Sequence, residues 1–274
     1  MTNTRDTSGE VLLADDFRSP RPAPDGLPSG WRARPAAGLP AGDGRARLTA
    51  GGLVVEPTGT DPVTGLPAFA HPAERGPSGP AEHLRWAAFA EHTDGTDATG
   101  APGFDLRHGE ALTAWLDLSA EVYGGAPGSS ANMICVDFAS GLVLDFLLTN
   151  DRVLVLYERL PRPGTGSFTY ELPVAARVPG RFHRCTVTVD AGRGSAHWWL
   201  DGTEVFTVPD LGHPLPAPAR PVRGTDGPLE SLRPARLALG VGMFADRPTG
   251  GMRLTVQRAR VHRRAAPGPG AQAA

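Results

Sequence analysis

Three short apolar runs separated by tight turns, between Asn132 and Leu160, constrain the fold more than any other part of this sequence. The runs NMICVDF, LVLDFLL and RVLVLYERL are rich in β-forming residues, and the turns fall at residues 139–141 and 149–151. Such runs are typical of neighbouring strands in an antiparallel meander. Nothing in the sequence resembles a crossover helix, so a parallel α/β sheet is not expected.

The same pattern of short strands and turns continues on both sides of the meander. Asp201-Gly202, between two β-rich runs, is a strong hairpin signal. The sequence therefore predicts an all-β, two-sheet antiparallel β-sandwich with minimal helix, for which room remains at Pro72–Leu84 and Pro214–Leu232. The other expected strands are Val11–Phe17, Arg45–Leu48, Leu53–Glu56, His83–Phe89, Ala111–Glu121, Arg184–Asp190, Ala196–Leu200, Glu204–Val208, Leu237–Phe244 and Met252–His262.

The chain is expected to form one domain over residues 10–264. A length of 274 residues suits a single sandwich, and no shift in composition marks a second unit. Residues 1–9 are polar and residues 265–274 lack large apolar side chains, so both ends are expected to be disordered. The proline-rich stretch 211–233 is expected to be a long surface loop.

Charge and composition exclude several classes of function. The formal net charge is -2, without the basic excess of a nucleic-acid binder or an anionic-membrane binder. All 27 cationic residues are arginine, so pyridoxal phosphate enzymes and P-loop nucleotidases, which need a lysine, are excluded. The N-terminus MTNTRDTSGEVLL lacks the features of a secretion signal, and no apolar run approaches the ~18 residues of a membrane helix. We therefore expect a cytoplasmic protein without nucleic-acid or membrane partners.

Several motifs together resemble the concanavalin A-like lectin/glucanase superfamily over most of residues 11–263. The opening LLADDFRSP with the following PSGW resembles the first strand of these sandwiches. The segment RFHRCTVTVDAGRGSAHWWLDGTEVF resembles their hairpins, and MRLTVQRARVH a closing strand. The run LLTNDRVLVLYERLP resembles an uncharacterised bacterial family of the same class. The resemblance implies a jelly-roll sandwich.

The sequence departs from the glycoside hydrolases of that superfamily at their catalytic strand. Their Glu-x-Asp-x-x-Glu strand carries two glutamates about 5 Å apart, a nucleophile and an acid/base. The strand in the comparable place here reads VDFAS at 136–140 or LDFLL at 144–148, and neither contains the glutamate pair. We therefore predict no retaining hydrolysis of β-glucans.

Period-two alternation along the meander divides its side chains between two faces. Taking residue 138 as the partner of 142, and 148 as the partner of 152, makes one face a continuous apolar surface. The residues expected in the core are Ile134, Val136, Phe138, Leu142, Leu144, Phe146, Leu148, Leu154 and Leu156. The opposite face then holds Cys135, Asp137, Val143, Asp145, Leu147, Val153, Val155, Tyr157 and Arg159.

That second face supplies the candidate site. Six residues are expected to converge on one cavity: Asp137, Asp145, Tyr157, Arg159, His197 and Trp199. In this hypothesis Asp137 or Asp145 is the base, and Tyr157 or His197 is the acid. Arg159 and Trp199 bind the substrate. An acid between valines has a raised pKa if it is covered, which suits a general acid or base. The alternative is a solvated outer face with a cross-strand Asp–Arg pair.

Two functions fit this face. The preferred one is a cytoplasmic, cofactor-independent enzyme of natural-product metabolism, a cyclase or isomerase acting on a largely apolar small molecule. The alternative is a non-catalytic carbohydrate-binding or ligand-binding module. The sequence does not indicate an oligomeric state.

No cofactor or metal motif is present. The histidines at 71, 83, 92, 108, 183 and 213 are scattered without metal-ligand spacing. Asp15-Asp16 fits a structural calcium site, although a solvated pair is the simpler interpretation. Gly240-Val241-Gly242 lies in a strand pattern and is not a phosphate loop. Cys135 and Cys185 lie in apolar strand patterns and are expected to be buried free thiols.

Overall fold

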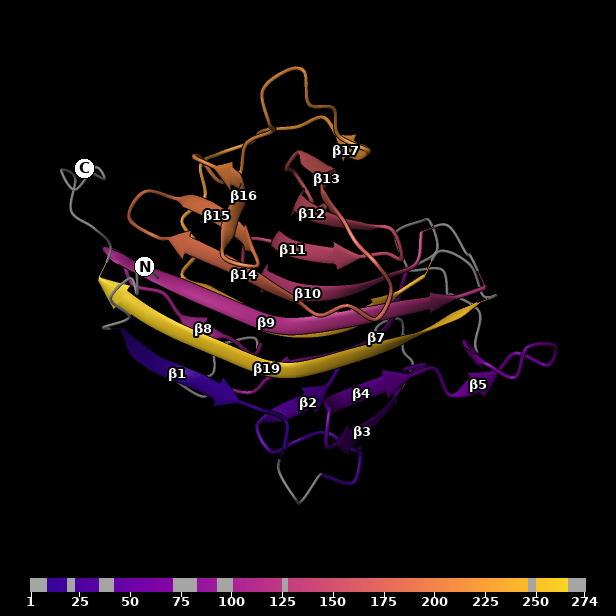
Figure 1. Cartoon of the computed structure of the whole chain (residues 1–274). Helices are drawn as coiled ribbons and strands as arrows, with labels where there is room; N and C mark the ends of the chain where they lie inside the picture. Colours follow the sequence, from indigo (N-terminus) through magenta and orange to yellow (C-terminus); the bar gives the residue numbers. More distant parts are fainter. Residues whose placement is uncertain are drawn as a thin grey trace.

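The chain folds into two antiparallel sheets packed face to face, as a computed structural model shows (Figure 1). The structure describes residues 9–18, 23–34, 42–70, 83–92, 101–124, 128–245 and 250–265. Within these ranges no residue is helical, and every strand pairing is antiparallel. The predicted all-β sandwich is therefore confirmed. The space left for a helix at Pro214–Leu232 holds none, and most of Pro72–Leu84 lies outside the described residues.

The first sheet has eight strands and is built around two long ones. β9 (Glu110–Tyr123) and β19 (Gly251–Ala265) pair from Tyr123 opposite Gly251 to Glu110 opposite Ala265, and cross the molecule side by side in Figure 1. β14 (His183–Asp190), β15 (Ser195–Leu200) and β16 (Thr203–Val208) extend the sheet beyond β9. Beyond β19 lie β4 (Gly52–Glu56) and β3 (Arg45–Thr49), and β1 (Glu10–Asp15) also pairs with β19.

The second sheet has nine strands and contains the predicted meander. Its order is β17 (Arg223–Thr225), β13 (Ser167–Ala176), β12 (Arg152–Arg159), β11 (Leu142–Leu148), β10 (Ser130–Asp137), β18 (Arg236–Phe244), β7 (Leu84–Ala90) and β2 (Trp31–Ala33), with β8 (Phe104–Asp105) pairing β18. A separate pair joins β5 (Gly59–Thr60) and β6 (Pro67–Ala68).

The main core lies between the two sheets, and we call the side of the nine-stranded sheet that faces it the inner face. Met133, Cys135, Leu144 and Phe146 point into this core from the nine-stranded sheet. A second, smaller apolar cluster lies on the opposite, outer face of the same sheet. It contains Ala87, Phe89, Ile134, Val136, Val143, Leu156 and Ala238. The central strands β10 and β11 of the nine-stranded sheet are thus buried on both faces.

The glycines of β18 make room on that outer face. A Cβ atom at Gly240 would lie 2.6 Å from ring carbons of Phe89, so a side chain there would displace the ring. Phe89 in turn contacts Phe138 with ring centroids 5.6 Å apart. Gly240 and Gly242 therefore serve packing within a strand, in agreement with the strand expected there.

Two turns in the meander pair differently from the expectation. Asp137, not residue 138, pairs with Leu142, and Leu148 pairs with Val153, not with residue 152. Because side chains alternate with a period of two, each one-residue difference moves a whole strand's side chains to the other face. The expected faces are correct for β11 and reversed for β10 and β12. Ile134, Val136 and Leu156, expected in the main core, belong to the outer cluster.

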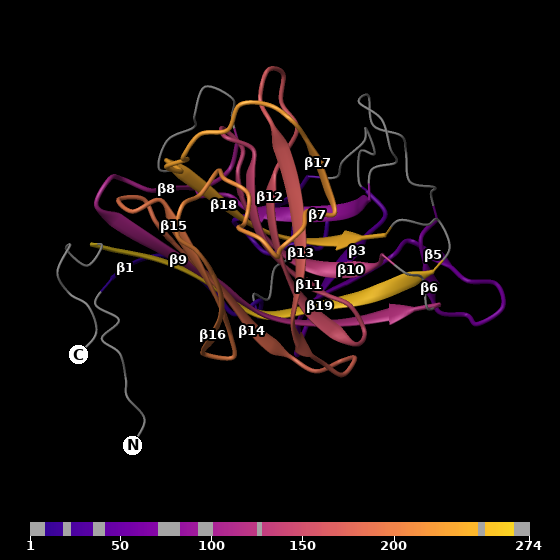
Figure 2. The ribbon, with the colours of Figure 1, turned by 90° about the horizontal axis from the view of Figure 1, so that it is seen from above.

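The expected surface loop at 211–233 is partly sheet. Residues 223–225 of this proline-rich segment form β17, which pairs with β13 at the edge of the nine-stranded sheet (Figure 2). Leu211 is fully buried in the main core and anchors the start of the segment. The expected disordered ends lie outside the described residues, apart from Gly9 and from Ala265, which ends β19.

The two cysteines provide a test of the core. Cys135 and Cys185 are both free and 0% exposed, and burial raises the pKa of each thiol. We expect no reaction with Ellman's reagent in the folded protein, because the reagent attacks exposed thiolates. After unfolding in guanidinium chloride, both of the chain's 2 cysteines should react. Rapid labelling of either thiol in native buffer would contradict the packing described.

Candidate functional site

Tyr157 lies on the inner face of β12 and holds the proline-rich segment. Its hydroxyl accepts a hydrogen bond from the backbone N–H of Gly212 at 2.9 Å and donates one to the carbonyl of His213 at 2.9 Å. The side chain is 0% exposed, and burial raises its pKa. A phenol that holds two loop groups in this way positions the loop, and it is not placed to protonate a ligand.

Arg159, two residues further along β12, binds the same segment. It is 3% exposed, and its Nη1 donates to the carbonyl of Gly212 at 3.3 Å. Its Nη2 lies 3.7 Å from a carboxylate oxygen of Glu230. A buried guanidinium needs such partners, because an unpaired buried charge is costly. Tyr157 and Arg159 thus anchor both ends of the proline-rich segment to one strand.

Asp145 lies on the outer face of β11, between Val143 and Leu147, and is 2% exposed. Its Oδ1 accepts the backbone N–H of Cys135 at 2.9 Å, and the side chain of Asn132 also hydrogen-bonds to it. Burial raises the pKa of the Asp145 carboxyl well above its ordinary value, which confirms the expectation for a covered acid between apolar neighbours. Two protein groups therefore already hydrogen-bond to this carboxyl.

A second acid, Glu158, shares this outer face. It lies on β12 diagonally from Asp145, since Asp145 pairs with Leu156. Thr169 donates a hydrogen bond to its Oε1 at 2.6 Å, and burial raises the pKa of the Glu158 carboxyl while the nearby Arg223 lowers it. The Arg223 guanidinium itself lies 3.0 Å from Nε2 of His83. His83 precedes β7, several strands away from β17, so two distant parts of the sheet meet over this face.

Asp137 on β10, and His197 and Trp199 on β15, do not share a face with Asp145. Asp137 ends β10 and caps its turn, accepting the N–H of Ala139 at 2.9 Å and the hydroxyl of Ser140 at 2.7 Å. His197 and Trp199 lie on the outside of the eight-stranded sheet, opposite the buried Trp198, as alternation in that hairpin predicts. His197 is partly exposed and bonds Glu204 through Nδ1 at 2.6 Å.

The expected convergence of these six residues is therefore wrong. Asp145 faces outward from the nine-stranded sheet, whereas Tyr157 and Arg159 face its interior, and His197 and Trp199 belong to the other sheet. The physical cause is the one-residue difference in each turn of the meander, together with the assumption that the next hairpin continues the same sheet.

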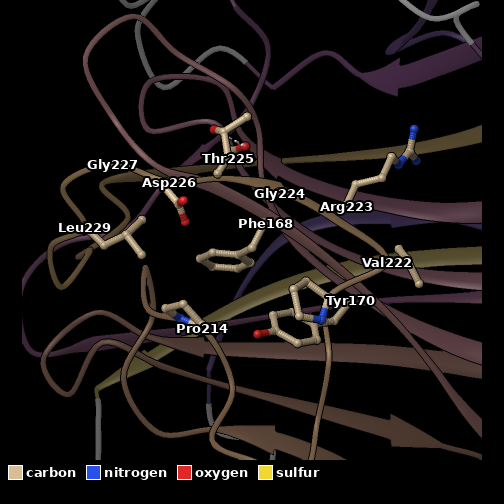
Figure 3. A pocket seen from close by; sticks show the side chains of 12 residues that line it. Phe168, Tyr170, Pro214, Val222, Arg223, Gly224, Thr225, Asp226, Gly227 and Leu229 are labelled. Atoms are coloured by element: carbon tan, nitrogen blue, oxygen red, sulfur yellow. Dashed lines mark hydrogen bonds between the residues drawn. The ribbon is translucent and has the colours of Figure 1, made fainter.

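The structure instead has a pocket of about 520 Å³ where β13, β17 and the proline-rich segment meet (Figure 3). We call it the edge pocket. Phe168 and Tyr170, on the inner face of β13, form its floor, and Pro214 and Leu229 contribute from the segment above. The full lining is Ser167, Phe168, Tyr170, Pro214, Pro221, Val222, Arg223, Gly224, Thr225, Asp226, Gly227 and Leu229.

At the edge pocket, β17 carries a glycine opposite Phe168, which lets its backbone lie close to that of β13. Gly224 pairs with Phe168, and a Cβ atom there would approach the carbonyl oxygen of Ser167 to 2.8 Å. Tyr157 packs against the floor from the core side, with its ring centroid 4.9 Å from that of Phe168. Tyr157 thus supports the floor and, through its hydroxyl, the segment that covers it. Tyr157, one of the residues predicted for the site, therefore supports this pocket from behind without lining it.

Sequence reasoning missed the pocket residues because no periodic signal links β13 to residues 214–229. Asp226-Gly227 and the surrounding prolines indicate a turn, and nothing in the pattern shows what lies beneath it. The available signal was the pair of aromatic residues at alternate positions, Phe168 and Tyr170, in a strand close to a long proline-rich stretch.

The described residues contain no group of three or more His, Cys, Asp or Glu side chains arranged to hold a metal ion. Asp15, suggested for a calcium site, accepts hydrogen bonds from the N–H of Phe17 at 2.7 Å and from the indole of Trp31 at 3.0 Å. Asp16 accepts the N–H of Arg18 at 3.1 Å. No helix in the described ranges is long and apolar enough to cross a bilayer.

The fold is the two-sheet sandwich that the resemblance to concanavalin A-like lectins and glucanases implied. The chain belongs to a family of unknown function (DUF6081), whose profile matches residues 14–268. No curated protein matches the sequence.

Solved structures share this fold at low identity. An endo-β-galactosidase from Clostridium perfringens that releases GlcNAcα1-4Gal matches with a TM-score of 0.54 and 12% identity, over 96% of this chain and 64% of that one. An endo-acting O-glycanase from human gut microbiota gives 0.51 and 12%, over 92% and 99%. The endo-β-1,3-glucanase of Pyrococcus furiosus gives 0.50 and 12%, over 92% and 93%. These likenesses define the architecture.

Removing the Tyr157 hydroxyl tests its role in holding the segment. We expect Tyr157→Phe to lower the free energy of unfolding by about 1–3 kcal/mol, because two buried backbone groups lose their partner. The amide of Gly212 should also exchange faster with deuterium. Tyr123→Phe is the control, since among the described residues the Tyr123 hydroxyl makes one long hydrogen bond, to Glu121 at 3.4 Å, and holds no backbone group. Equal stability of both variants would contradict the anchoring role.

The pH dependence of stability tests the environment of Asp145. Its pKa is higher in the folded chain than the unfolded value of about 3.9, so the folded state holds the proton more tightly. Stability from this group is complete below the unfolded pKa and is lost as pH rises through the folded pKa. We expect Asp145→Asn to gain stability relative to wild type as pH rises from about 4 to 8 in chemical denaturation. A constant or falling difference would refute the burial described.

Proposed function

We propose that this protein binds a small, largely apolar molecule in the edge pocket and acts as a non-catalytic ligand-binding module. The observation that carries the proposal is the pocket itself. Its volume of about 520 Å³ lies in the usual range for small-molecule sites. Its lining combines apolar side chains with a comparable share of polar groups, and concave sites in which a few polar groups converge are common places for small molecules.

The ligand proposed is apolar rather than a glycan. The three structural relatives above act on glycans according to their names, and sugar binding usually uses an open aromatic face. In the edge pocket, Phe168 is 2% exposed and Tyr170 is 1% exposed, so they form a floor and not a stacking platform. Pro214, Val222 and Leu229 add apolar walls, which favour an apolar body over a hydroxyl-rich one.

Binding fits this pocket better than acid–base catalysis. A cyclase or isomerase of natural-product metabolism needs an acid and a base on one ligand. Among the described lining residues Asp226 is the one carboxyl group, and the Tyr170 hydroxyl hydrogen-bonds the backbone of Leu215. The absence of the glutamate pair still predicts no retaining hydrolysis of β-glucans. A cytoplasmic location remains a prediction that suits a small metabolite as ligand.

Titration with N-phenyl-1-naphthylamine, an uncharged dye that fluoresces in apolar surroundings, tests the proposal. We expect a saturable signal with one site per chain. Leu229→Trp, which fills the pocket beside Phe168, should weaken dye binding about tenfold or more. The measurement is the dye's dissociation constant by fluorescence.

Val178→Trp is the matched control, because it adds the same ring at a position that is 63% exposed and does not line the pocket. This variant should bind the dye as wild type does. Absence of saturable binding, or equal binding by the two tryptophan variants, would overturn the proposed function.

A further inference from the structure

The charges around the edge pocket point in different directions. Asp226 and Arg223 both belong to its lining, but their side chains separate (Figure 3). The Asp226 carboxylate points toward the Phe168 ring, whereas the Arg223 guanidinium points away from the pocket. Arg223 is held on the outer face by His83 at 3.0 Å and lies close to Glu158. The interior of the pocket is therefore left with a negative charge.

The alternation of β17 explains this separation. Arg223 pairs with Thr169 and Thr225 with Ser167, both on the outer face, while Gly224 between them pairs with the inward-facing Phe168. β17 therefore places the Arg223 side chain on the outer face of the sheet, while Gly224 borders the edge pocket on the inner face. Asp226 follows directly after the strand and returns over the opening.

The other polar side chains at the pocket are already satisfied. Ser167 and Thr225 hydrogen-bond each other at 2.9 Å, and the Tyr170 hydroxyl bonds the backbone of Leu215. Asp226 has neither a hydrogen bond nor an ion pair with any described residue, and it is exposed. Beneath it lies an aromatic cluster in which the Phe168 and Tyr170 centroids are 5.7 Å apart. Because these two rings are 2% and 1% exposed, the group that can attract a cation at the opening is the Asp226 carboxylate.

We propose that the ligand of the edge pocket is a small organic cation, a protonated amine on an apolar body. The ammonium group lies against Asp226, and the apolar body lies over Phe168 and between Pro214 and Leu229. This inference rests on the proposed function and specifies the chemical class of the ligand. A carboxylic acid of the same shape is disfavoured, because its charge would meet that of Asp226.

Three probes of similar shape and different charge test the ligand class. They are 4-phenylbutylamine, 4-phenylbutan-1-ol and 4-phenylbutyrate, which are cationic, neutral and anionic at pH 7. Each is titrated at low salt, and the amide resonances of Gly224 and Gly227 report binding by NMR. We expect the amine to bind about three- to tenfold more tightly than the alcohol, as for an exposed ion pair, and the acid to bind most weakly.

Asp226→Asn should remove the preference for the amine and leave the affinity for the alcohol unchanged. Asp151→Asn is the control, because it removes the same charge from an exposed site in the β11–β12 turn. It should keep the full order of the three probes. Added salt should reduce the preference for the amine in wild type.

The outcomes separate the two proposals. If all three probes bind equally, or the acid binds best, the proposal of a cationic ligand is wrong. The proposal that the edge pocket binds a ligand is then still supported. If the amine preference persists in Asp226→Asn, the assigned carboxylate is wrong and the inference falls. If no probe perturbs Gly224 or Gly227 at its solubility limit and the dye also fails to bind, the proposed function itself is overturned.

Discussion

The edge pocket depends on the buried hydroxyl of Tyr157. A phenol placed inside a sandwich must find hydrogen-bond partners, and Tyr157 finds them in the backbone of Gly212 and His213, more than 50 residues away in sequence. Those two bonds bring the proline-rich segment against the open end of the core. The ring of the same residue packs on Phe168 and so supports the floor of the pocket. One side chain thus couples the core to the surface where a ligand is proposed to bind.

The positions of the meander strands could be predicted from the sequence because each strand is a β-rich run between turn residues. The face on which each side chain lies could be predicted only in part. Alternation identifies faces when one is polar, but every residue of β10 is buried, and β11 is buried except for Leu147. Because both faces are apolar, only the turn length indicates which residue pairs with Leu142. An error of one residue in that pairing exchanges the two side-chain faces of the neighbouring strand. Asp145 was placed correctly because β11 served as the reference.

The two acids of the outer face show how a polar group can resemble a catalytic one. Asp145 has the raised pKa that a general acid needs, yet the N–H of Cys135 and the side chain of Asn132 already hydrogen-bond to its carboxyl. Glu158 is likewise bonded to Thr169. A perturbed pKa follows from burial alone, so it marks a catalytic group only where a ligand has access to it. Asp226 does border the edge pocket, and the sequence pattern around it indicates only a turn.

β17 also determines how the nine-stranded sheet ends. An unpaired strand edge can recruit another chain, and proteins protect such edges with short strands, glycines and prolines. β17 is three residues long, contains Gly224, and lies between Pro221 and Pro228, so it offers a poor template for a further strand. It also covers the edge of β13 at Ser167–Thr169, the first three residues of that ten-residue strand. A molecule that displaced β17 would uncover Ser167–Thr169 of that edge, so the binding proposed for the edge pocket requires β17 to stay paired.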